Sequence, residues 1–381
     1  MIVKLLVIIL SSYAVLYLIF SIIIAIGEKR IKPREIPGDL PLVSVIVCAR
    51  NEEKNIGRCC ESLHHLDYPK DKLEILLVDD ESNDKTMSIM RVYAEKDSVF
   101  RILSTKGEPR DLPAKQRPLA LGIRSSKGEI LLITDADIAV KPGWIKAHLS
   151  AYDSHIGIVG GATRIDRSSG KLFDSLQCCD LITKHAVAMG CAGLGFPLSI
   201  MGNNISFRRD AYDMVGGFRN MGVSVVEDMA LMNEIVHRTH YTLGWVAKKE
   251  GIVTSVPEND FTTFVNQRLR WIYELSNLSV IGKVMIAIET LMMCAWYLSL
   301  CIIPWSVIPI VLISFLWIVG YYITLSLSPH KEKGDSWFIP GMIIFQMIYS
   351  IVIVWRKLSG QRSIEWKGRV FERTGTEKGR G

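Results

Sequence analysis

The chain has 381 residues, of which 49% are hydrophobic and 22% are charged, and its formal net charge is +6. This composition excludes an intrinsically disordered chain and argues against an ordinary water-soluble one. Most of the positive charge lies in residues 356–381, where eight Lys or Arg less three Glu give +5. We expect no nucleic acid among the partners of the protein.

Residues 2–26 are apolar apart from Lys4. A helix needs about 20 apolar residues to cross a membrane. The run also exceeds the roughly 7 to 15 residues of a signal-peptide core, and no small-residue cleavage site follows it. Residues 1–27 are therefore predicted to be a transmembrane anchor. The basic cluster from Lys29 to Arg34 predicts that the next domain lies in the cytoplasm.

Residues 42–260 alternate between short β-branched runs and longer helical periods. The predicted strands are Val43–Cys48, Glu74–Val78, Phe100–Leu103 and Glu129–Thr134, and helices are predicted at about 52–65, 84–96, 115–126 and 142–152. This alternation predicts an α/β fold with a mostly parallel sheet. Ligands bind such sheets beyond the carboxyl ends of the strands. No G-x-G-x-x-G or P-loop motif occurs there, which argues against dinucleotide oxidoreductases and P-loop NTPases.

Polar and acidic residues follow three of these strands. They are Arg50-Asn51-Glu52-Glu53, Asp79-Asp80 and Asp135-Ala136-Asp137. One Asp or Asn in such a place is typical of a helix N-cap. Paired carboxylates at neighbouring strand ends would repel each other, however, unless a divalent cation and a phosphate-bearing ligand bind between them.

The order of these motifs resembles that of the family 2 glycosyltransferases of the GT-A fold. The resemblance runs from about 43 to 275 and includes four further motifs: Gly202-Asn203-Asn204-Ile205-Ser206-Phe207-Arg208, Gly216-Gly217-Phe218, Glu227-Asp228 and Gln267-Arg268-Leu269-Arg270-Trp271. It implies a Rossmann-like GT-A catalytic domain. The tail motif Trp366-Lys367-Gly368-Arg369 is similar to that of bacterial members that glycosylate lipids or carotenoids.

The resemblance implies a donor site at the strand ends. Asp79 or Asp80 would hydrogen-bond the base or ribose, and Arg50 and Glu52 would lie beside the base. Asp135 would face the nucleotide and share Mg²⁺ or Mn²⁺ with Asp137, since these cations prefer carboxylate and phosphate oxygens. Cys48-Ala49-Arg50 replaces the commoner Pro-x-Tyr, so the base stays open between uracil, which we favour, and guanine.

Lys115 opens a predicted helix and has two open interpretations, a nucleotide contact or a solvated lysine.

The resemblance assigns the catalytic base to Asp228. From the residues alone, the favoured interpretation of Glu227-Asp228 is an N-cap pair before a helix over Met229–Arg238. A single base with direct displacement implies inversion at the anomeric carbon. Arg270 would pair with the diphosphate, and the acceptor or diphosphate side would also include Asn203, Asn204, Glu227, Gln267 and Trp271. A glycine-containing loop over 186–207 would lie on the acceptor side.

Residues 261–278 are also predicted to form an interfacial helix, because a basic segment with Trp precedes a hydrophobic stretch. Residues 279–355 are predicted to hold the C-terminal transmembrane helices. Thr290 to Ser328 has no charge in 39 residues and fits two helices joined at Pro304 and Pro309, and Trp337 to Trp355 fits another.

Four crossings would place the basic tail, 356–381, outside, although its charge predicts the inside. One segment is therefore expected to lie in the interface. Lys283 and Glu289 indicate 279–300 as the candidate.

These features predict an inverting, metal-dependent glycosyltransferase, a hexosyltransferase, that moves a sugar from a nucleotide-sugar donor to a membrane lipid acceptor. It would be a multi-pass protein of the cell membrane with a cytoplasmic catalytic domain and the lipid bilayer as a partner; its oligomeric state is left open. A processive polysaccharide synthase is the first alternative, but the C-terminal segments show no polar row to line a channel. The second is a noncatalytic membrane scaffold, against which the intact Asp135, Asp137, Asp228 and Arg270 argue.

Overall fold

The computed structural model of the chain describes residues 2–36, 38–113, 115–221, 227–273, 280–301, 304, 307–359, 363–366 and 369–372. The chain divides into two compact units, and each is assembled from several separate stretches. One comprises Met1–Arg30, Arg167–Leu198 and Leu275–Ser359 and is helical. The other comprises Ile31–Asp166, Ser199–Glu274 and Gly360–Gly381 and is an α/β unit.

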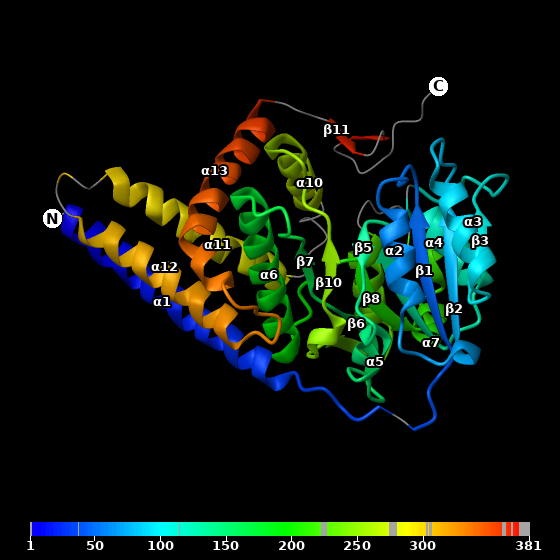
Figure 1. Cartoon of the computed structure of the whole chain (residues 1–381). Coiled ribbons are helices and arrows are strands. Elements are labelled where there is room, and N and C mark those ends of the chain that lie inside the picture. The colour runs from blue at the N-terminus through cyan, green and yellow to red at the C-terminus, as the bar shows by residue number, and fades with distance from the viewer. Residues whose placement is uncertain are drawn as a thin grey trace. The chain divides into compact units, whose positions relative to one another are not determined.

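The α/β unit is built on a seven-stranded sheet of order β3-β2-β1-β4-β8-β6-β9 (Figure 1). Its strands are β1 (Val43–Ala49), β2 (Leu73–Asp79), β3 (Phe100–Ser104), β4 (Ile130–Asp135), β6 (Ile156–Gly160), β8 (Asn204–Arg208) and β9 (Thr242–Trp245). The first four in sheet order are parallel, and β8 runs antiparallel to β4 and β6. The predicted mostly parallel α/β fold is therefore confirmed.

Helices cover both faces of this sheet. The helices of the α/β unit are α2 (Ile56–His64), α3 (Thr86–Lys96), α4 (Gln116–Ser125), α5 (Trp144–Leu149), α7 (Arg209–Met214), α8 (Gly217–Asn220), α9 (Glu227–Arg238) and α10 (Phe261–Tyr273). The apolar face of α2 packs into the same core as Val45 and Val47 of β1. On the other face Gly122 of α4 sits so close to Ile46 that an added Cβ would come within 2.7 Å of its Cγ2.

Two smaller sheets complete the α/β unit. β5 (Ile138–Ala139), β10 (Val253–Ser255) and β7 (Thr163–Ile165) form a three-stranded sheet in that order. β11 (Ser363–Trp366) and β12 (Arg369–Glu372) form an antiparallel hairpin, and β11 lies beside α10. Two residues of the predicted tail motif, Lys367 and Gly368, lie outside the described residues, as do 274–278 of the predicted interfacial helix.

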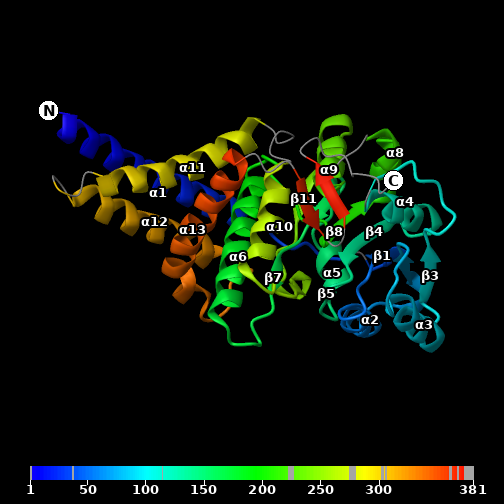
Figure 2. The ribbon, with the colours of Figure 1, turned by 90° about the horizontal axis from the view of Figure 1, so that it is seen from above.

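The helical unit consists of α1 (Ile2–Arg30), α6 (Leu172–Gly193), α11 (Val280–Cys301), α12 (Ile308–Leu327), a short 3-10 turn, η4 (Asp335–Phe338), and α13 (Ile339–Leu358). Figures 1 and 2 show that α1, α11 and α12 run alongside one another, while α6 and α13 cross them. Within the described residues, α1, α11, α12 and α13 are long and apolar enough to cross a membrane. The prediction of two helices in the uncharged stretch is confirmed.

Helix α6 corrects one expectation, because residues 186–193 are helical rather than part of a loop. The apolar side chains of this segment are buried, including Ala186 and Met189. Gly190 lets α6 approach α1 closely, since a Cβ there would lie 2.5 Å from the carbonyl oxygen of Ile24. Burial against α1 thus outweighs the turn tendency of the glycines.

Candidate active site

The strand register brings the predicted acidic residues to one edge of the sheet. Ala49, the last residue of β1, pairs with Asp79 of β2, and Cys48 pairs with Asp135 of β4. Parallel strands end at the same edge, so the residues that follow β1, β2 and β4 meet there.

The loops after β1 and β2 are joined by backbone-to-side-chain hydrogen bonds. The Asn83 N–H donates to Asn51 Oδ1 at 2.8 Å, and the Asn51 N–H donates to Ser82 Oγ at 3.1 Å. Asn51 and Glu81 both have positive φ, at 54° and 57°, which is uncommon for residues other than glycine. The two loops therefore hold each other in a conformation that neither would adopt easily alone.

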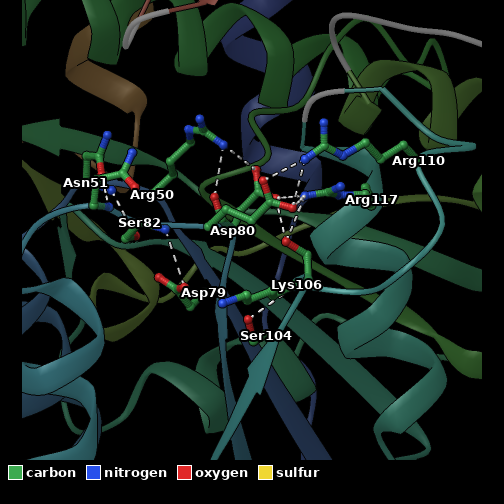
Figure 3. A network of polar contacts seen from close by, with 12 residues as sticks. Arg50, Asn51, Asp79, Asp80, Ser82, Ser104, Lys106, Arg110 and Arg117 are labelled. Atoms are coloured by element: carbon green, nitrogen blue, oxygen red, sulfur yellow. Dashed lines mark hydrogen bonds and ion pairs between the residues drawn. The ribbon is translucent and has the colours of Figure 1, made fainter.

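Three arginines surround Asp80 (Figure 3). Arg117 donates to Asp80 Oδ1 at 2.8 Å, to Thr105 Oγ1 at 2.8 Å and to Glu81 Oε1 at 3.1 Å. Arg50 donates to the carbonyl oxygen of Asp80 at 3.0 Å, while Arg110 pairs with Glu81 at 3.1 Å. Asp80 is 5% exposed and Arg117 10%, so this ion pair is largely shielded from water.

Asp79 has different surroundings. Its Oδ2 lies 3.4 Å from the Ser82 N–H, and its Oδ1 is buried with no hydrogen-bond donor among the described residues. A buried acceptor without a donor costs about 1–3 kcal/mol. Asp79 is therefore the carboxylate at this edge that is best placed to accept a hydrogen bond from a ligand.

Glu52 is buried, and its hydrogen bonds hold the loop in which it lies. Its backbone N–H donates to Thr86 Oγ1 at 2.7 Å, and its Oε2 accepts from Asn55 Nδ2 at 2.8 Å. Glu52 thus orients the loop that carries Arg50 and fixes the start of α2.

Lys115 connects the end of β4 with the start of α9. Its Nζ pairs with Asp135 Oδ1 at 2.5 Å and with Glu227 Oε1 at 3.3 Å. Burial would lower the pKa of Lys115, but the attraction of Asp135 and Glu227 outweighs burial and raises it. Lys115 therefore carries its charge beside Asp135 and Glu227, with 28% of its side chain exposed.

Asp228 lies in the first turn of α9, next to Glu227. Its Oδ1 accepts from the Met229 N–H at 2.7 Å, and its Oδ2 accepts from the Gly202 N–H. A Cβ at Gly202 would lie 2.9 Å from Asp228 Oδ2, so glycine is required for this approach. Burial, and then the charge of Glu227, raise the pKa of Asp228 to about 7. A carboxyl group with this pKa is suited to general base catalysis near neutral pH.

Asp135 and Asp137 are both partly exposed beyond β4, and the carbonyl oxygen of Asp137 accepts from Arg58 at 2.6 Å. Among the described residues, no group of three or more His, Cys, Asp or Glu side chains is arranged to hold a metal ion. Two carboxylates fit a Mg²⁺-type cation that takes its other oxygens from a diphosphate and water. The donor set is thus compatible with a cation that binds together with a nucleotide.

The two asparagines of the Gly202–Arg208 motif differ from each other. Asn203 Oδ1 accepts from Thr163 Oγ1 at 2.8 Å, and this side chain is partly exposed. Asn204 is fully buried: its Oδ1 accepts from Trp144 Nε1 at 2.9 Å and its Nδ2 donates to the Ala162 carbonyl at 2.8 Å. The amide of Asn204 fixes β8 within the core, in contrast to the expected position facing an acceptor.

Gln267, Arg270 and Trp271 lie on α10 at spacings of three and four residues, so they share one face of the helix. Arg268 organises two of them. Its guanidinium lies 4.1 Å from the ring centroid of Trp271 and 4.3 Å from that of Phe264, and it donates to Gln267 Oε1 at 2.6 Å. Gln267 in turn donates to Glu258 at 2.7 Å.

Sequence reasoning missed Arg117 and Arg268 as contributors to the site. Each is one basic residue in a chain with 45 Lys and Arg. Arg117 is recognisable only when α4 is placed next to the end of β2. Arg268 had a local signal, because Phe264 and Trp271 stand four residues before it and three after it on a helix.

The α/β fold and its acidic strand ends define a glycosyltransferase of the GT-A type. The fold is shared with mannosyltransferase PcManGT from Pyrobaculum calidifontis, solved in complex with GDP-Man and Mn2+. The TM-score is 0.55 at 16% identity, covering 92% of this chain and 99% of that chain. The chain belongs to glycosyl transferase family 21, whose model matches residues 5–378. The predicted kinship with glycosyltransferases of the GT-A fold is thereby confirmed.

Curated relatives include a probable glycosyltransferase, YdaM, of Bacillus subtilis (strain 168), which is 28% identical over 245 residues, 63% of this chain and 56% of the relative. A beta-monoglucosyldiacylglycerol synthase of Nostoc sp. is 25% identical over 253 residues, 65% of this chain and 52% of the relative. The chain thus spans about half the length of these relatives.

Proposed function

We propose that the protein transfers a sugar from a nucleotide-sugar donor, with a UDP-sugar favoured, to the hydroxyl of a membrane lipid, with inversion at the anomeric carbon. The observation that carries this proposal is the chain of contacts from Asp135 through Lys115 to Glu227 and Asp228. It joins a strand-end carboxylate to a partly buried acid with a raised pKa, although more than 90 positions separate them in the sequence.

The donor would bind across the strand ends. Asp79 Oδ1 would accept from the N3–H of uracil or from a ribose hydroxyl, which would satisfy its buried oxygen. Arg117 would act through Asp80 by fixing the loop after β2. Asp135 and Asp137 would hold Mg²⁺ or Mn²⁺, which when bound neutralises charge on the departing diphosphate.

The acceptor hydroxyl would attack the anomeric carbon from the Asp228 side. Its proton passes to the Asp228 carboxylate as the new C–O bond forms, and the bond from the anomeric carbon to the diphosphate oxygen breaks with its electron pair. Lys115 holds Asp135 and Glu227 in position for this step. Arg270 would contact the diphosphate, while Gln267 and Trp271 would lie on the acceptor side.

A lipid acceptor is supported by the apolar helices and by the lipid product named for the Nostoc relative. We propose a multi-pass membrane protein whose catalytic unit faces the cytoplasm, because basic residues follow α1 directly. The linear division into an anchor (1–27), a catalytic domain (42–260), an interfacial helix (261–278), transmembrane helices (279–355) and a basic tail (356–381) stays a proposal. Residues 167–198, within the second of these segments, belong to the helical unit.

The test is to incubate purified membranes with a panel of labelled nucleotide sugars plus Mg²⁺ or Mn²⁺. We expect label from a UDP-sugar to enter an organic-extractable lipid. The labelled lipid should be absent when the membranes contain the Asp228→Asn variant instead of the native protein. Label in a high-mass polymer would support a processive synthase instead. Nucleotide binding without any transfer across the panel would support a noncatalytic scaffold.

A further inference from the structure

Helix α13 has an exposed face that is entirely apolar. Its side chains Ile344, Ile348, Ile351, Trp355 and Leu358 are each more than half exposed and recur at spacings of three and four residues. They therefore form one stripe along the helix. The opposite side of α13 is buried within the helical unit. The length and hydropathy of α13 permit a membrane crossing, but the connectivity of the chain argues against one.

The chain enters and leaves α13 on the side of the membrane that holds the α/β unit. The α/β unit follows α1 and precedes α11 directly. α11 and α12 are antiparallel, since Glu289 meets Tyr321 and Trp296 meets Ser314. α12 thus returns the chain to the side from which α11 started. After α13, strand β11 belongs to the α/β unit again and lies beside α10.

The neighbour of α13 gives independent support. α6 is a single helix inserted between β7 and β8, and both strands belong to the α/β unit. A lone helix whose two ends return to the same side does not cross the bilayer. α13 packs along α6: Phe345 lies 5.8 Å from Phe173 between ring centroids, and the Tyr349 hydroxyl donates to Asp180 Oδ1 at 3.0 Å.

Glu289 had indicated α11 as the segment that stays in the interface. In the helical unit its carboxylate accepts hydrogen bonds from Tyr17 and Tyr321, each at 3.1 Å. An acidic side chain with such partners is compatible with a crossing helix. One of the two reasons for excluding α11 from the crossings is thereby removed, and the other, Lys283, lies in the first turn of the helix, where a lysine can reach the interface.

We propose that α1, α11 and α12 cross the membrane and that α13 lies in the plane of the interface, with its apolar stripe against the lipid acyl chains. The C-terminal end of the helix is basic, with Arg356 and Lys357 in its last turn, whereas Glu332 and Asp335 balance the two lysines that precede the helix. The basic end matches the anionic headgroups of such an interface. Three crossings also place the tail on the same side as Lys29 and Arg30, as the distribution of basic residues requires.

The test uses a membrane-impermeant maleimide on sealed vesicles of both orientations. Three proteins, each with one cysteine added, are made in a background that lacks Cys294 and Cys301, the two exposed cysteines among the described residues, and keeps the six less exposed ones. One restores Cys301 at the end of α11, one carries Ser359→Cys after α13, and one carries Glu95→Cys on α3 to report the side of the α/β unit. The background itself gives the baseline.

We expect Ser359→Cys to react from the same side as Glu95→Cys, and Cys301 to react from the opposite side. Reaction of Ser359→Cys together with Cys301 would show that α13 crosses and would overturn the proposal. Reaction of Cys301 together with Glu95→Cys would also overturn it, because α11 and α12 would then not form a transmembrane hairpin.

Protease removal of an epitope tag fused after Gly381 repeats the test without substitutions. The tag should be cleaved from the side of the α/β unit, and cleavage from the opposite side would contradict the proposal. The outcome does not depend on whether the protein transfers a sugar.

Discussion

Two acidic pairs at the site have opposite electrostatic surroundings. At Asp80 and Glu81, burial would raise the pKa of Glu81, but Arg117 and Arg110 outweigh it and lower that pKa. At Glu227 and Asp228, burial and the neighbouring carboxylate raise the pKa of Asp228, and Lys115 opposes this only in part. The surroundings of the two carboxylates thus suit them to different roles. Glu81 stays charged and holds its loop, whereas Asp228 can accept a proton.

The largest effect is expected from Asp228→Asn, which removes the proton acceptor of this pair. An amide cannot take up the proton of the lipid hydroxyl, so we expect turnover to fall by roughly 10²- to 10⁴-fold. Nucleotide affinity should stay near that of the native chain, since Asp79 and Asp80 are untouched. Labelled transfer and calorimetric titration with UDP measure the two quantities. Unchanged turnover would remove Asp228 as the base.

Arg117→Met should affect stability and donor binding together. It removes the nearest guanidinium from buried Asp80 and leaves Arg50 at 3.9 Å and the Thr105 hydroxyl, so the loss should stay below the roughly 3–5 kcal/mol of an ion pair broken completely. The thermal unfolding midpoint and the affinity for UDP should both fall. Arg124→Met, on the same helix, is the control: its pair with Glu108 is exposed and contributes about 0–1 kcal/mol. Equal effects of the two changes would contradict a special role for Arg117.

The pH dependence of transfer should report Asp228. The base acts when ionised, so the rate should rise with pH through about 7, the raised pKa of this group. Glu227→Gln removes the neighbouring charge and lowers the pKa of Asp228, so the acid limb should move to lower pH by roughly 1 unit. A rate profile across pH 5–9 measures this shift. A limb that stays in place would show that another group controls it.

Arg268→Gln should have the smallest effect. It removes the guanidinium between Phe264 and Trp271, an interaction of about 0.5–2 kcal/mol. The KM for the lipid acceptor should rise by roughly 2- to 30-fold if the loss appears in acceptor binding. Donor affinity should remain unchanged. Arg238→Gln on α9 is the control, because its pair with Glu234 lies on the surface. A change in donor affinity alone would show that Arg268 acts on the donor side of the site and not on the acceptor side.

The sequence predicted the first half of the α/β unit well because local patterns determine it. β1, β2, β3 and β4 match their predicted strands to within a residue or two at each end, and the helices between them are present. Buried parallel strands are short and apolar, and polar turn residues mark their ends. Asp79, Asp80 and Asp135 could be placed at one edge for the same reason.

Features that depend on distant contacts were not predictable in this way. α6 contains glycines and polar residues such as Asp180, and only its packing in the helical unit explains why it is helical. The burial of Asn204 depends on Trp144, some 60 positions away. The charge of Lys115 inside the site depends on Asp135 and Glu227, which no local pattern connects to it.

The insertion of α6 has a practical consequence for work with this protein. β8 lies in the middle of the large sheet between β4 and β6, yet the ribosome makes it only after α6. The sheet therefore cannot close before a segment destined for the helical unit has been synthesised. Cutting the chain after α1 and before α11 would leave α6 without its apolar neighbours. A soluble catalytic fragment would require replacing 167–198 with a short linker between β7 and β8.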